Sequence, residues 1–201
     1  MDRLHFEVLN SIVLKKMASA GSVASATGLS LGQVEGAMTG LEQAGHIVLV
    51  GEQALAGDSA PDQVSEFAET CYAELRREDD ANRLADRFET VNARFLDALA
   101  HWHQVDVGGR KVTNDHSDAD YDAKVITRVD RAVQQLCDIL ASLSQRDPRF
   151  ERYARRLEAA MRRVDQGDTA YVSTPTVDSV HNVWFEFHED LLRTMGRARR
   201  E

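Results

Sequence analysis

The stretch that decides the fold of the N-terminal part of the chain is "SLGQVEGAMTGLEQAGHI", residues 30–47. Ser30, followed three residues later by Gln33, forms a capping box, which marks the start of a helix. Gly45 is a typical residue at a helix C-terminus. The apolar residues between them recur at helical spacing: Val34, Ala37, Met38 and Leu41. The sequence therefore predicts an amphipathic helix over about residues 30–44.

The segments on either side of this helix predict its structural context. Residues 4–18 read as a helix and residues 23–27 as a second, short helix, with a tight turn before Ser30. After the helix, residues 46–50 and 53–56 read as two strands of a hairpin. Helix, short helix, turn, helix and hairpin is the order of a winged helix-turn-helix domain, which we predict over residues 1–57.

The charge of this domain does not decide whether it binds DNA or another protein. Gln33, Thr39 and Gln43 face outward and can hydrogen-bond to DNA bases or to a partner protein. However, residues 1–60 contain three basic and six acidic side chains, and residues 30–44 contain no lysine or arginine. Neutralised phosphates supply much of the affinity of DNA-binding proteins. Two hypotheses follow: a DNA-binding transcriptional regulator, and an adaptor that docks a partner enzyme through residues 30–44.

The rest of the chain is predicted to be helical. Residues 57–62 read as a linker, and residues 63–201 as an antiparallel helical bundle. The loop that separates the bundle helices is expected at residues 105–117, which hold paired glycines. The helical segments are 63–77, 81–103, about 118–145, a segment that ends near 165, and about 177–196. The fold class is therefore mainly α, with a winged-helix head and an all-helical second domain.

Net charge and hydrophobicity limit the partners and the cellular compartment that we expect for the protein. The net charge of −9 over 201 residues argues against non-specific binding to nucleic acid or to anionic membranes. No apolar run approaches the ~20 residues that span a bilayer, and the N-terminus does not resemble a signal peptide. We expect a cytoplasmic protein whose two cysteines, Cys71 and Cys137, are buried or half-buried thiols.

Histidines and aromatic residues suggest a pocket in the helical domain. His181, Trp184 and His188 fall on one helical face, and Asp97 with His101 forms an i, i+4 pair. We predict a small-molecule pocket built from Trp102, His116, Tyr121, His181, Trp184 and His188. A divalent metal bound by Asp97, His101, His181 and His188 is an alternative use of the same region. Hydrogen-bonded core histidines are the other interpretation of this pattern.

Motifs for catalysis are scarce. The sequence has no nucleophile motif, no phosphate-binding glycine loop and no dinucleotide fingerprint. A metal-dependent enzyme is therefore the third and weakest hypothesis, after the regulator and the adaptor. The leading hypothesis is a homodimeric regulator in which a ligand in the bundle pocket changes the state of the head.

Two resemblances support this interpretation. A winged-helix head followed by a helical body resembles the GntR group of metabolite-sensing regulators, whose helical domains often hold a metal through an Asp-x-x-x-His pair. Asp97 with His101, then His181 and His188, match that pattern loosely. "NDHSDADYD" (114–122) and "VHNVWFEFHEDLLRTMG" (180–196) resemble a small actinobacterial family. Its members are labelled as regulators or as relatives of pyruvate phosphate dikinase and other phosphoenolpyruvate-utilising enzymes. The motifs of the dikinase reaction are absent, so the resemblance implies no catalytic role.

Overall fold

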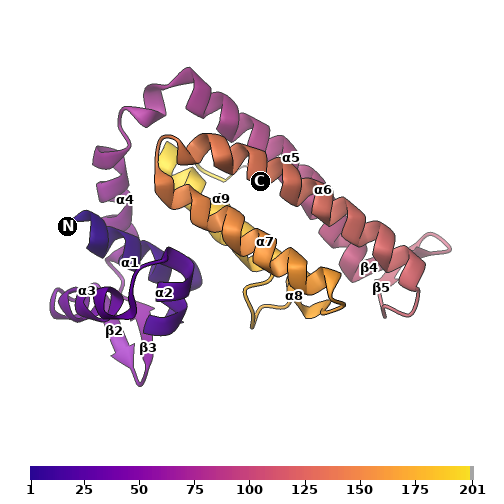
Figure 1. Ribbon diagram of the computed structural model, residues 1–201, viewed down its shortest axis with the longest axis horizontal. Helices are drawn as coiled ribbons and strands as arrows, with labels where there is room; N and C mark the ends of the chain where they lie inside the picture. Colours follow the sequence, from indigo (N-terminus) through magenta and orange to yellow (C-terminus); the bar gives the residue numbers. More distant parts are fainter. Residues whose placement is uncertain (200–201) are drawn as a thin grey trace. The chain divides into compact units, whose positions relative to one another are not determined.

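The computed structural model describes residues 1–199, which are mainly helical with two small antiparallel sheets (Figure 1). This confirms the predicted mainly-α class. The chain divides into two compact units. Unit 1 comprises Met1–Asn82 and the chain from Trp184 onward, and unit 2 comprises Arg83–Val183. The predicted linker at residues 57–62 lies inside unit 1, and the division between the units falls within two helices.

The N-terminal part of unit 1 contains three helices and a three-stranded sheet. Its elements are α1 (Arg3–Lys15), β1 (Met17–Ser19), α2 (Ala20–Thr27), α3 (Leu31–Gln43), β2 (Ile47–Val50) and β3 (Gln53–Ala56). The sheet is antiparallel in the order β1–β3–β2, with Met17 opposite Leu55 and Ile47 opposite Ala56. Ser30 caps α3 in the predicted capping box. Phe6, Ile12 and Leu41 are among the fully buried side chains that hold these elements together.

The remaining part of unit 1 includes most of the last helix. It contains α4 (Ala60–Cys71), the 3-10 turn η1 (Leu75–Arg77), the start of α5 (Asp79–His103) and the C-terminal part of α9 (Val180–Met195). Buried polar contacts join α9 to α1: Lys15 Nζ lies 2.8 Å from Glu186 Oε1, and Asn10 Nδ2 donates to Asp190 Oδ1 at 2.9 Å. Glu186 and Asp190 of α9 therefore have structural partners on α1. Removal of one partner from a buried ion pair is strongly destabilising.

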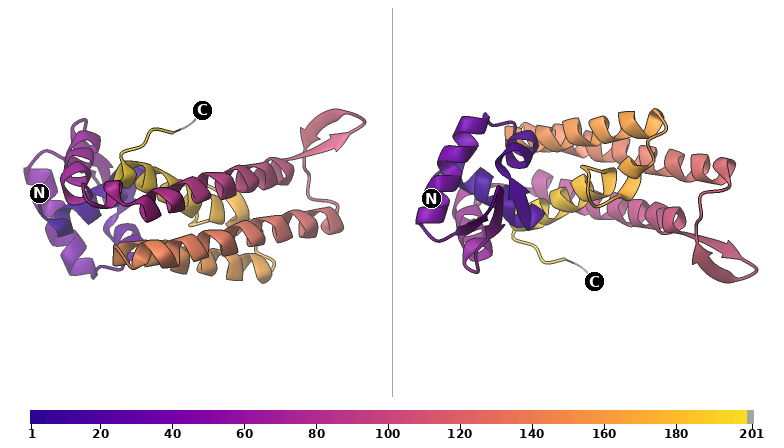
Figure 2. Two further views of the ribbon diagram at one scale, coloured as in Figure 1. Left: turned by 90° about the horizontal axis from the view of Figure 1, so that it is seen from above. Right: turned by 90° about the horizontal axis from the view of Figure 1, so that it is seen from below.

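Unit 2 is built on long helices. After most of α5 come the strands β4 (Gln104–Val107) and β5 (Arg110–Thr113), α6 (Ala119–Ser144), η2 (Pro148–Phe150), α7 (Glu151–Asp165), the short α8 (Ala170–Ser173) and the start of α9. Figures 1 and 2 show α6 and α7 side by side, and the short turn η2 makes them antiparallel. The helix faces that meet are apolar, with Phe88, Leu136, Ile139 and Leu157 fully buried.

Two segments differ from their sequence-based predictions. Residues 105–117, predicted as a loop, contain the β4–β5 hairpin, which projects past the ends of α5 and α6 in Figure 2. Gly108 and Gly109 both have positive φ, which is the requirement of a type I′ hairpin turn. The predicted helix 4–18 ends at Lys15, and residues 17–19 join the sheet as an edge strand. Hydrogen bonds between β1 and β3 thus hold residues 17–19 in an extended conformation, although their apolar spacing predicts a helix.

The cysteines and the apolar helices complete the description. Cys137 is half-buried, as predicted, and burial raises the pKa of its thiol to about 11. Cys71 is exposed, so the prediction for that residue was wrong: it stands at the end of α4, where Arg3 of α1 lies 3.7 Å from its Sγ. Across residues 1–199, none of the helices is both long enough and apolar enough to cross a bilayer.

Candidate functional site

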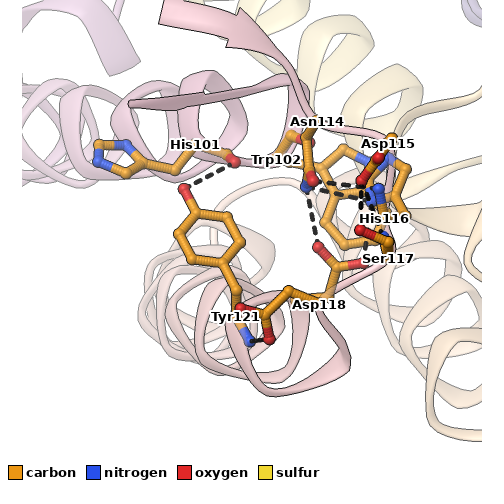
Figure 3. Close-up of polar contacts among 9 residues, drawn as sticks. His101, Trp102, Asn114, Asp115, His116, Ser117, Asp118 and Tyr121 are labelled. Carbon is orange, nitrogen blue, oxygen red and sulfur yellow. Dashed lines mark hydrogen bonds and ion pairs between the residues drawn. The ribbon is translucent and has the colours of Figure 1, made fainter. Parts of the chain in front are cut away.

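The polar cluster that stands out in unit 2 lies where α5 ends, the β4–β5 hairpin returns and α6 begins (Figure 3). Asn114 closes this junction, because its backbone N–H donates to His103 O at 2.9 Å at the base of the hairpin. Asp118 caps α6 by accepting from Tyr121 N at 2.9 Å. The loop between Asn114 and Asp118 is thus fixed at both ends, and its side chains are held against the end of α5.

Asn114 is the centre of a buried hydrogen-bond network. Its side-chain Nδ2 donates to Trp102 O at 3.1 Å and to Asp122 Oδ1 at 2.9 Å. Its Oδ1 accepts from the backbone N–H of His116 at 3.1 Å. Asn114 is 7% exposed and Asp122 is 9% exposed. Hydrogen bonds in such a buried setting are stronger than in water, so the network gives the loop one conformation.

His116 completes this network in an unusual conformation. Its Nδ1 lies 2.9 Å from Asp122 Oδ2 and 3.2 Å from Asn114 Nδ2. Because Asn114 Nδ2 is itself a donor, we assign the Nδ1 proton to the bond with Asp122. The imidazole lies 4.3 Å from the ring of Trp102. The backbone φ of His116 is +58°, a left-handed conformation that is uncommon outside glycine.

A cavity of about 730 Å³ opens beside this network. Its volume is within the range of small-molecule pockets, about 300–1,000 Å³. The lining residues come from α5, the hairpin and the loop before α6: Asp97, Ala100, His101, Gln104, Val105, Asp106, Val107, Lys111, Val112, Thr113, Asn114, Asp115, Ser117, Asp118 and Tyr121. We refer to it as the hairpin cavity.

The hairpin cavity carries an excess of negative charge. Its lining includes four aspartates and one lysine, Lys111. Hydrogen bonds from Ser117 lower the pKa of Asp115, which therefore stays ionised at neutral pH. The valines of the hairpin and the ring of Tyr121 provide apolar and aromatic surface beside these carboxylates. A cationic molecule with an apolar body matches this lining.

The predicted pocket residues are gathered only in part. Trp102 and His116 contact Asn114, which lines the cavity, and Tyr121 lines it directly, with its hydroxyl donating to His101 O at 3.2 Å. His181 lies elsewhere in unit 2, where its ring is 6.5 Å from that of Phe95. Burial, with a smaller contribution from His103, lowers the pKa of His181.

Two further predicted pocket residues belong to unit 1. Trp184 is 2% exposed and His188 is 6% exposed. Both lie on the part of α9 whose acidic neighbours bond to α1, so the structure accounts for them as core residues. Residues of the motif "VHNVWFEFHED" lie in two different units, because the division between the units falls within α9. His181 belongs to unit 2, whereas Trp184 and His188 belong to unit 1.

The predicted metal ligands do not form one group. Asp97 and His101 are neighbours, with 3.9 Å between a carboxylate oxygen and Nδ1, but the Asp97 carboxylate also pairs with the guanidinium of Arg128. Across residues 1–199 there is no group of three or more His, Cys, Asp or Glu side chains arranged to hold a metal ion.

Asn114 and Asp122 were missed as site residues by the sequence analysis. Both stand in the segment 114–122, where these two residues were noted only as part of a resemblance to a family. The available signal was the combination of an asparagine, a histidine and an aspartate within nine residues of a loop–helix boundary. Such short spacing allows polar side chains to satisfy one another before a helix begins.

The predicted contact residues of the head lie on the exposed face of α3. Gln33 accepts the Ser30 N–H at 3.0 Å within the capping box, and Thr39 Oγ1 donates to Glu35 O at 3.0 Å. Gln43 is exposed near the end of α3. Gln33 and Thr39 thus have local partners that a macromolecule would need to replace.

The cations of the head are mostly engaged. Arg3 pairs with Glu7 at 2.8 Å and donates to Tyr72, and Lys15 pairs with Glu186. Lys16 is the remaining basic residue among residues 1–60, and it is exposed. The head therefore presents one exposed, uncommitted cation with which to neutralise phosphates.

Comparisons with protein-family models, curated proteins and solved structures find no match to this chain.

Proposed function

We propose that the protein is a ligand-responsive regulator whose helical unit binds a small organic cation in the hairpin cavity. The cavity itself supports this most directly, because it combines ligand-sized volume with an excess of carboxylates over cations. The buried network of Asn114, His116 and Asp122 keeps one wall rigid, as a pre-organised binding site requires.

We also propose that residues 1–57 form a winged helix-turn-helix head, the output of the regulator. The order α1–β1–α2–α3–β2–β3 and the sheet order β1–β3–β2 support this assignment. Domains of this kind most often place their recognition helix in the major groove of DNA. A homodimer, in which two heads act together, is part of the same proposal.

The surface of the head favours a protein over DNA as its partner. α3 exposes Glu35 and Glu42, and the β2–β3 turn exposes Glu52. The hairpin also exposes Val48 at 56% and Val50 at 60% of their surface. Exposed apolar side chains beside acidic ones are typical of protein-binding surfaces, whereas phosphates require cations. The adaptor form of the hypothesis is therefore the one that the head supports better.

The cavity is tested by titrating the protein with 1,5-diaminopentane and with tetramethylammonium while amide NMR spectra are recorded. We expect saturable shifts of hairpin and α6 N-terminal signals, weakened in Asp115→Asn. Asp120→Asn is the matched control, since it removes the same charge from the adjacent first turn of α6, and Asp120 does not line the cavity. Equal weakening in both variants, or no saturation with either cation, would contradict a cation site here.

The head is tested with genomic DNA fragments in a mobility-shift assay at low salt. If the head contacts protein, we expect no sequence-specific shift at micromolar protein. A specific shift that weakens when Gln43 is replaced by alanine would instead establish the DNA-binding form of the regulator. Each outcome leaves the cavity experiment independent, because that experiment reports only on unit 2.

A further inference from the structure

Three arginines line a small groove on the surface of unit 2. The groove has a volume of about 210 Å³. Its lining residues are Arg94 and Asp97 of α5 with Arg128, Arg131, Ala132 and Gln135 of α6. On α6 these positions follow the i, i+3, i+4, i+7 spacing of a single helix face. Ala132 is buried and small, so it leaves space between the longer side chains around it. We refer to this feature as the arginine groove.

Only one of the three guanidinium groups in the arginine groove is paired with a carboxylate that lines the groove. Arg128 pairs with Asp97, the only carboxylate among the lining residues. Arg94 donates to Gln135 Oε1 at 3.2 Å, which is a neutral acceptor. Arg131 is exposed, and its guanidinium makes no hydrogen bond or ion pair with another of residues 1–199. Two positively charged side chains therefore line one groove without an acidic partner among the described residues, in a chain whose net charge is −9.

We propose that the arginine groove binds a small, doubly charged oxyanion of the phosphate-monoester class. A guanidinium presents paired N–H donors whose geometry matches phosphate oxygens. The volume is below the range of pockets that enclose a whole drug-sized ligand, so the groove holds the phosphoryl group while the rest of the molecule stays in solvent.

This site is distinct from the hairpin cavity, although Asp97 lines both. The cavity has four carboxylates and selects cations, whereas the groove has three guanidiniums and selects anions. Asp97 already neutralises Arg128 in the absence of a ligand. Arg94 and Arg131 are therefore the two residues that make the contacts specific to the anion.

Isothermal titration of the full chain with inorganic phosphate, at constant ionic strength maintained with chloride, tests the site. We expect saturable binding to the wild type, weakened about tenfold or more in Arg131→Gln, because a hydrogen bond to a charged group contributes about 1.5–3 kcal/mol. Arg131 has no hydrogen-bond or ion-pair partner within the described residues, so this change breaks no such bond of the folded chain. Arg94→Gln should weaken phosphate binding in the same direction.

Arg110→Gln is the matched control. It removes the same side chain and the same charge from the tip of the β4–β5 hairpin, outside the groove. Its phosphate affinity should stay within about twofold of the wild type, a difference of about 0.4 kcal/mol. Equal weakening by Arg110→Gln and Arg131→Gln would show general charge screening and overturn the proposal. Absence of saturable phosphate binding to the wild type would also overturn it. Neither result bears on amine binding in the hairpin cavity, which the NMR titration measures separately.

Discussion

Replacement of Asn114 by alanine should destabilise the protein more than any exposed change near it. The variant loses two hydrogen bonds to neutral backbone groups, at 3.1 Å to Trp102 O and at 3.1 Å from His116 N. It also loses one bond to the carboxylate of Asp122 at 2.9 Å. Bonds between neutral groups contribute about 1 kcal/mol each, and bonds to charged groups about 1.5–3 kcal/mol.

These values must be reduced because solvent reaches one end of the network. The side chain of His116 is 41% exposed, whereas that of Asp122 is 13% exposed, and Asp122 keeps His116 as a partner. Water can therefore replace part of what Asn114 supplies. We expect the free energy of unfolding of Asn114→Ala to fall by about 2–4 kcal/mol.

Urea unfolding followed by circular dichroism measures this change. Thr113→Ala is the control, because Thr113 is the exposed neighbour of Asn114 at the end of β5. Its side chain makes no hydrogen bond to any of residues 1–199. We expect that control to change the free energy of unfolding by less than about 1 kcal/mol. A loss below about 1 kcal/mol in Asn114→Ala would refute the view that this network fixes the wall of the cavity.

Three further predictions concern conformation, helix stability and pH. The free energy of unfolding of His116→Gly, from urea titration, should exceed that of His116→Ala by about 0.5–1 kcal/mol. Both variants lose the imidazole, but glycine tolerates φ +58°, and the larger conformational entropy of glycine in the unfolded chain offsets only part of that gain. Equal stabilities would argue against backbone strain. Gly36→Ala should stabilise the head by about 0.8–1 kcal/mol in thermal unfolding, since nothing lies within 4 Å of the added Cβ, whereas Gly40→Ala should gain less because that Cβ would lie 2.9 Å from His5 Nε2. Burial lowers the pKa of His181 in the folded state, so the unfolded chain binds the proton more tightly and stability falls as the pH drops below the ordinary value of 6.5. The difference in unfolding free energy between about pH 8 and about pH 5 should therefore shrink in His181→Gln, and an unchanged difference would show that other groups cause the acid sensitivity.

The sequence by itself determined most local structure. The capping box at Ser30 and Gln33, the apolar spacing of α3 and the glycine after it placed that helix correctly. The long apolar stripes of α5 and α6 likewise predicted their helices. These features depend on residues within a few positions of one another, so the chain encodes them without reference to the rest of the fold. The β4–β5 hairpin was missed because the polar residues around Gly108 and Gly109 obscured a short alternation of valines.

The tertiary structure decided which residues share a site. Of the predicted set, Tyr121 lines the hairpin cavity, whereas Trp102 and His116 pack against each other and contact Asn114 beside it. Trp184 and His188 were predicted with them, but helical periodicity describes the face of a helix and does not identify what packs against it. The contacts of α9 with α1, about 180 residues apart along the chain, depend on long-range packing that no local pattern contains. For the same reason the arginine groove emerged only when α5 and α6 were placed side by side, because its charges are contributed by two helices whose register the sequence does not state.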